Sequence, residues 1–231
     1  MPCHTETKMS TETINMHAVP AAITQQAKAK LIKNTYLLLS MTLLFSGVTA
    51  GVSMAYNLPH PGLILTLVGF FGLLFAVNKF QNSGLGIVLV FALTGFMGLT
   101  LGPMLNAYLS LPNGSSLVMN AMLMTSAIFL SLSAYVLTTK KDFSFMGGFL
   151  AVGILVAFMA GLGAYFFEMK SLSLVVSSMF VLLMSGLILY ETSNIVNGGQ
   201  TNYVMATVAL FVSIFNLFTS LLHLMGFMNQ E

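Results

Sequence analysis

Charge is scarce in this chain of 231 residues: only 6% of them are Asp, Glu, Lys or Arg, against roughly 25% in a soluble domain. Arginine and tryptophan are missing, and Cys3 is the only cysteine. So few charges cannot cover the surface of a water-soluble protein, and eight lysines are too few for a nucleic-acid surface. One cysteine excludes a disulfide framework and a cysteine-based metal site. Because 57% of the residues are hydrophobic, lipid must be the main solvent.

Long apolar runs, separated by short polar or proline-containing stretches, fill most of the chain. A membrane helix needs about 20 such residues. The first 27 residues show no apolar face, so we predict a flexible cytosolic tail over 1–27 and a transmembrane domain over 28–231. The fold class is an all-α membrane protein, a bundle of seven transmembrane helices. We expect these helices at residues 31–56, 62–77, 84–105, 117–137, 145–167, 172–190 and 204–228.

The lysines indicate how the bundle is oriented, since cytosolic loops of membrane proteins carry an excess of basic residues. With seven helices and a cytosolic N-terminus, one lysine, Lys170, falls outside the membrane and the C-terminus is outside too. Six lysines at the helix ends and in short loops fall inside: Lys28, Lys30, Lys33, Lys79, Lys140 and Lys141.

Catalytic patterns are missing from the sequence. Asp142 is the only aspartate, which excludes an intramembrane protease with two catalytic aspartates. Neither an HExxH zinc motif nor a GxSxG nucleophile motif occurs, and the loops are too short to hold a soluble catalytic domain. We therefore expect no enzyme, no cofactor and no metal site.

Several segments resemble a known family. Residues 98–105, GLTLGPML, are similar to the Gly-Pro segment in the third helix of the Bax inhibitor-1 family, and residues 121–126 resemble its next motif. The similarity is stronger still to the bacterial YccA-type branch. Segments that resemble this branch are 61–69, 133–139, 191–195 and 198–203.

The resemblance implies two functions. YccA-type proteins are inner-membrane partners and substrates of the FtsH protease, and they restrain its attack on other membrane proteins. This implies a modulator of a membrane AAA protease in the bacterial inner membrane. The alternative is a pH-sensitive calcium or cation leak channel, which in this family uses facing carboxylates on helices six and seven. Glu191 matches the first carboxylate, but Ser213 stands where the family pattern has Asp.

Polar residues near helices six and seven are the functional candidates. Glu191 either contacts or gates an ion, or caps a neighbouring helix, because a carboxylate within a membrane is costly and usually has a role. Ser213 and Asn216 share one face of a helix, and Asn194 and Asn197 have the same spacing. They form either a functional polar seam or ordinary hydrogen bonds between helices.

A second group of candidates lies on helix three. Gly95, Gly98 and Gly102 lie on or near one side, and Gly98 and Gly102 form a GxxxG pair, which lets two helix backbones approach closely. Pro103 removes one backbone hydrogen bond and can kink the helix. We expect tight packing inside the bundle rather than a dimer interface.

Overall fold

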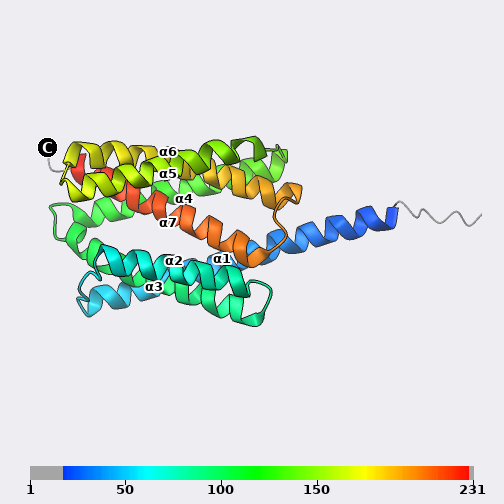
Figure 1. Ribbon diagram of the computed structural model, residues 1–231, viewed down its shortest axis with the longest axis horizontal. Helices are drawn as coiled ribbons and strands as arrows, with labels where there is room; N and C mark the ends of the chain where they lie inside the picture. Colours follow the sequence, from blue (N-terminus) through cyan, green and yellow to red (C-terminus); the bar gives the residue numbers. More distant parts are fainter. Residues whose placement is uncertain (1–17, 229–231) are drawn as a thin grey trace, which may run out of the picture.

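The computed structural model describes residues 18–228, and within this range it contains helices and no strand (Figure 1). A single 3₁₀ turn, Ser144–Met146, precedes α5. The α-helices are α1 Ala18–Ala55, α2 Leu63–Phe80, α3 Gly84–Leu109, α4 Gly114–Thr139, α5 Gly147–Phe166, α6 Lys170–Asn197 and α7 Tyr203–Met228.

All seven helices are long and apolar enough to cross a membrane. The shortest, α2, has 18 residues, or about 27 Å at 1.5 Å per residue, and the hydrocarbon core of a bilayer is about 30 Å thick. The prediction of an all-α bundle with seven transmembrane helices is therefore confirmed.

Helix α6 is longer than predicted, because it runs seven residues beyond Tyr190 to Asn197. Polarity rises after Tyr190, but nothing there breaks a helix until Gly198, which has a φ of 87°. The amides of Gly198 and Gln200 both donate to Asn194 O, an arrangement that closes a helix on a left-handed glycine. Glu191 consequently lies inside α6 and not in the following loop.

Helix α1 also begins earlier than expected, at Ala18, and its membrane-spanning part begins at Gln25. The predicted tail over residues 1–27 therefore overlaps the helix at residues 18–27, and residues 1–17 lie outside the described range. The overlap is rich in alanine and glutamine, which favour helix. Hydropathy alone could not place this start, since the polar stretch from Thr24 to Lys33 separates the first turns of α1 from its long apolar run.

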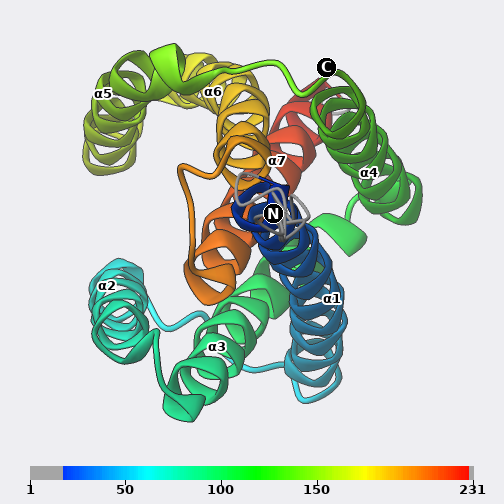
Figure 2. The same ribbon diagram turned by 90° about the vertical axis from the view of Figure 1, so that its right-hand side faces the viewer.

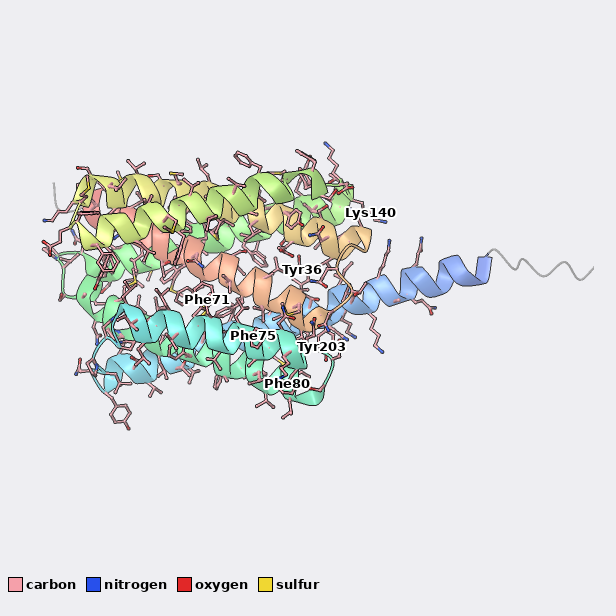
Figure 3. The ribbon with its side chains drawn as sticks, viewed as in Figure 1. Tyr36, Phe71, Phe75, Phe80, Lys140 and Tyr203 are labelled. Carbon is pink, nitrogen blue, oxygen red and sulfur yellow. The ribbon has the colours of Figure 1, made fainter. Side chains whose placement is uncertain are left out.

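Helix α7 occupies the centre of the bundle and crosses it obliquely (Figures 1 and 2). Its first half, which includes Val204 and Phe211, packs in a hydrophobic cluster with α1, α2 and α3. Its second half, which includes Leu217 and Leu222, packs in another cluster with residues of α4, α5 and α6. Helices α2 and α5 lie at the periphery, and α2 exposes Phe71 and Phe75 (Figure 3).

The start of α1 lies at the same end of the bundle as three connections, α2–α3, α4–α5 and α6–α7 (Figure 1). The lysine distribution predicts that this end lies in the cytosol, so a membrane-impermeant maleimide should label Cys3 only after cells are lysed. In a Cys3→Ser background, a Lys170→Cys variant should be labelled in intact cells, because the α5–α6 turn is at the opposite end. Labelling of Cys3 in intact cells would reverse the proposed orientation.

Candidate functional site

The three glycines singled out on α3 face α1. A Cβ atom at Gly98 would collide with Thr49 Oγ1 and Ser46 O of α1, and one at Gly102 would collide with the Ser53 side chain. A Cβ at Gly95 would lie 2.7 Å from the ring of Phe45. The glycines therefore allow α1 and α3 to pack backbone against backbone, within the bundle.

Pro103 acts together with this close approach. Because proline has no N–H, Leu99 O, four residues earlier, loses its helical donor. Ser53 Oγ of α1 donates to this same carbonyl at 2.8 Å. Gly102 leaves room for the serine beside the proline. A gap in the hydrogen bonding of one helix is thus filled by its neighbour, and the two helices are joined at that point.

Glu191 lies on α6, six residues or about 9 Å before its last residue, Asn197. Its side chain is partly buried, and it makes no hydrogen bond or ion pair within residues 18–228. Its neighbour Thr192 is fully buried and lies 3.3 Å from Ser133 Oγ of α4. Tyr36 of α1 donates to that serine at 3.0 Å (Figure 3). A polar chain across three helices therefore ends at the residue that follows Glu191 in the sequence.

The residues considered for a polar seam between α6 and α7 form no hydrogen-bonded chain with one another among the described residues. Ser213 is fully buried, and its hydroxyl donates to Ala209 O in its own helix at 2.8 Å. Asn216 donates to Val212 O, also within α7. Ser213 lies about 15 Å along α7 from Tyr203, roughly a helical turn deeper than Glu191 lies along α6. The candidates thus share a helix pair without bonding to one another.

The C-terminal end of α6 is fastened to the α4–α5 connection instead. Asn197 Nδ2 donates to Lys141 O at 3.4 Å, and Ser193 Oγ accepts from the amide of Phe143 at 2.9 Å. Asn194 contributes its carbonyl to the helix cap, described above. In the same connection Asp142 accepts a bond from the amide of Ser144, and this bond lowers the pKa of its carboxyl.

Asn202 ties the next connection to the same end of the bundle. Its Oδ1 accepts from the amides of Val204 and Met205 at the start of α7. Its Nδ2 donates to Gln81 O and Asn82 Oδ1 in the α2–α3 connection. Three connections are thus joined at the end predicted to be cytosolic, through the uncharged side chains of Ser193, Asn197 and Asn202.

Histidine 223 provides a comparable junction near the opposite end. Its two ring nitrogens lie 3.1 Å from Tyr108 OH of α3 and 3.0 Å from Ser173 Oγ of α6. Sequence reasoning did not find these junctions. Serine, asparagine and histidine at a helix end indicate hydrogen bonding but not the partner.

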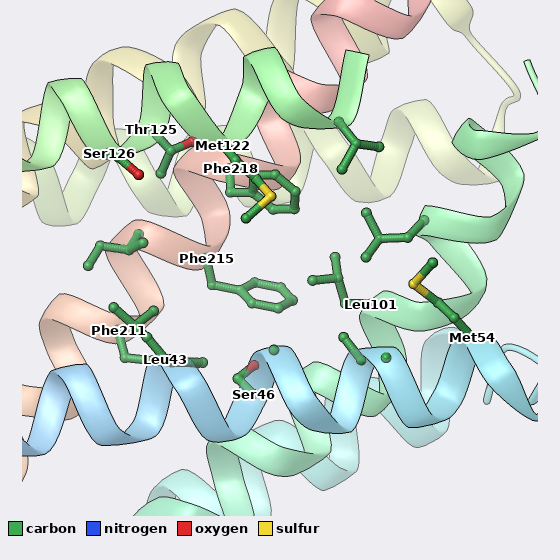
Figure 4. Close-up of a pocket in the computed structure, with 16 residues that line it drawn as sticks. Leu43, Ser46, Met54, Leu101, Met122, Thr125, Ser126, Phe211, Phe215 and Phe218 are labelled. Carbon is green, nitrogen blue, oxygen red and sulfur yellow. The ribbon is translucent and has the colours of Figure 1, made fainter. Parts of the chain in front are cut away.

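A cavity of about 450 Å³ lies between α1, α3, α4 and α7 (Figure 4). Apolar side chains such as Leu43, Met54 and Met122 line it, and the polar groups are hydroxyls, among them Ser46 and Thr125. Phe215 of α7 projects into it (Figure 4). Within residues 18–228 no group of three His, Cys, Asp or Glu side chains could hold a metal ion.

Comparisons with known proteins cover nearly the whole chain. A family model described as inhibitor of apoptosis-promoting Bax1 matches residues 28–230. An Escherichia coli protein named modulator of FtsH protease YccA is 50% identical over 202 residues, covering 87% of this chain and 92% of its own length. A Pseudomonas aeruginosa protein is 51% identical over 206 residues, covering 89% and 93%. A membrane protein of Vibrio cholerae is 45% identical over 203 residues, covering 87% and 91%.

The junction between Ser53 and Leu99 can be tested by a double-mutant cycle. Ser53→Ala leaves a carbonyl without a donor in a membrane interior, which should destabilise the protein by about 1–3 kcal/mol. In a Pro103→Ala background the new N–H can donate to Leu99 O, so Ser53→Ala should cost much less. Thermal unfolding in detergent measures both. An equal loss in the two backgrounds would contradict the assigned role of Ser53.

Proposed function

This chain belongs to the Bax inhibitor-1 family, and we propose that it is an inner-membrane modulator, and itself a substrate, of an FtsH-type membrane protease. The observation that carries the proposal is the 50% identity, over 92% of its length, to the Escherichia coli protein named modulator of FtsH protease. None of the relatives named above is described as an enzyme. We therefore propose a protein that acts through binding and not through catalysis.

The described part of the chain offers little surface outside the membrane. The connections between its helices are short; the two longest, over residues 56–62 and 140–146, have seven residues each. A partner must therefore engage the membrane helices or an end of the chain. Residues 1–17 are mostly polar and include Glu6, Lys8 and Glu12, and on the proposed orientation they are cytosolic. We propose this N-terminal segment as the point where the protease engages the chain.

The packing of α1 supports the proposal that the protease degrades this protein slowly. A protease that pulls on the N-terminus must first draw α1 out of the bundle, and forced unfolding is governed by the rate of unfolding. Along α1, Tyr36 bonds to α4 and Ser53 bonds to α3. Thr35 O accepts from Thr207 of α7 at 3.3 Å. A substrate held in this way would occupy the protease for long periods and so spare its other substrates.

Deleting about residues 2–20 should lengthen the lifetime of the protein in cells, because the protease loses the end that it grips. Replacing the same residues by a Gly-Ser repeat of equal length should restore degradation, if length and not sequence is required. Ser53→Ala should act in the opposite direction and shorten the lifetime. Pulse-chase measurements in cells with and without the protease test all three variants. An unchanged lifetime after the deletion would exclude the N-terminal segment as the grip.

The second candidate function is a calcium leak channel. The residue that argues against it is Ser213, which stands where the family pattern has Asp. Helix α7 contains no carboxylate, so Glu191 has no acidic partner there with which to share a proton. In liposomes we expect little calcium flux between about pH 6 and 8, or a flux without the pH dependence of such a pair. Ser213→Asp should introduce pH dependence, and adding Glu191→Gln should remove it. A steep pH response of the unmodified protein that survives Glu191→Gln would favour the channel.

A further inference from the structure

A cavity of about 520 Å³ lies between α2 and α5. The backbones of these two helices stand apart at the periphery of the bundle (Figure 2). Its floor is formed by α3, α6 and the central helix α7. Its volume lies within the range of about 300–1,000 Å³ that is usual for small-molecule sites. The two flanking helices expose most of their surface to lipid, so a molecule dissolved in the bilayer can enter sideways.

Aromatic rings form much of the wall. The ring of Phe96 is held against the backbone of α2, since a Cβ at Gly69 would lie 2.5 Å from it. Such rings favour a flat, aromatic-like ligand, which can stack or meet their edges. Six phenylalanines line the cavity: Phe70, Phe71, Phe96, Phe158, Phe180 and Phe215 (Phe71 is labelled in Figure 3).

One side chain in this cavity has hydrogen-bonding groups to spare. Asn216 lies thirteen residues after Tyr203, or about 20 Å along α7, which is near the middle of this helix of 26 residues. Its Nδ2 uses one hydrogen to bond Val212 O, and within residues 18–228 its Oδ1 has no donor. A second N–H and the Oδ1 acceptor are thus available at the depth of the lipid tails, where an unpaired amide is costly.

The phenylalanine wall and the Asn216 amide together indicate which class of ligand the cavity can bind. A phospholipid acyl chain has no polar group at this depth and would leave the amide unpaired. A quinone ring is flat, and its carbonyl accepts from the free N–H. The hydroxyl of the reduced ring donates to Oδ1. An isoprenoid tail can leave between α2 and α5 into the bilayer.

We propose that the cavity between α2 and α5 binds a quinone-class lipid, with the ring among the phenylalanines and one ring oxygen on the Asn216 amide. The site does not rest on the proposed protease function, because it uses neither the N-terminal segment nor the α1–α3 junction. Thr100 of α3, whose hydroxyl donates to Met97 O, also lines the cavity and keeps acceptor capacity for a reduced ring.

The test uses the full chain in nanodiscs of quinone-free phospholipid, titrated with decylubiquinone. The unmodified protein should unfold at a higher temperature as the quinone is added, and quinone should also co-purify with the protein from native membranes. Asn216→Leu should weaken binding about five-fold, as expected for one lost hydrogen bond. Ala151→Phe, which fills the mouth of the cavity on α5, should abolish the shift.

Ala127→Phe is the matched control, because Ala127 is exposed on α4 and lines none of the cavities described here. It should bind quinone as the unmodified protein does. If Asn216→Leu does not unfold cooperatively, the quinone-dependent thermal shifts of Ala151→Phe and Ala127→Phe are compared, and a shift lost only in Ala151→Phe supports the site. No thermal shift in the unmodified protein, equal effects of the two phenylalanine variants, or co-purification of phospholipid alone would each overturn the proposal.

Discussion

The hydrogen bond from Ser53 to Leu99 O supplies a partner for a backbone carbonyl inside the membrane, where every backbone polar group needs one. A bilayer offers no water to a backbone group that lacks a partner, so a carbonyl freed by proline needs a donor from the protein. Pro103 frees the carbonyl, Gly102 brings α1 within reach, and Ser53 supplies the proton. The position of α1 against α3 follows from these three residues, and α7 packs against both helices.

Most other polar side chains in the bundle form their hydrogen bonds with the backbone of their own helix. The hydroxyls of Thr125, Ser177, Ser185 and Ser213 each donate to the carbonyl four residues earlier in their own helix. Such bonds cost no partner on another helix and leave the contacts between helices to apolar packing and glycine. Side chains that reach another element therefore stand out, and they gather at the two ends of the bundle and along α1. Glu191, Asn216 and the buried Thr35 differ from both groups, because each keeps a side-chain polar atom without a partner among the described residues.

The sequence alone predicted the number and type of helices, because apolar runs of about 20 residues have one stable form in lipid. It also identified Gly98, Gly102 and Pro103 as a packing site. It missed the last seven residues of α6, since hydropathy falls at Glu191 whereas the helix ends only at Gly198. It could not find Ser53, because the proline shows that a donor is needed but not which helix provides it. Spacing alone could not decide between a polar seam and ordinary hydrogen bonds at Asn194, Ser213 and Asn216 for a related reason: helical spacing places residues on one face of a helix but does not determine what that face meets.

The proposed protease substrate role and the proposed quinone site depend on different parts of the molecule. Extraction from the N-terminus acts first on α1, whose bonds reach α3, α4 and α7. The cavity between α2 and α5 touches no residue of α1. Helix α3 is nevertheless common to both, since Leu99 O faces Ser53 while the next residue, Thr100, lines the cavity. The stretch of α3 around Leu99 is therefore where the residues of the two proposals come closest, because the proline makes α3 depend on α1 for a hydrogen bond at that point.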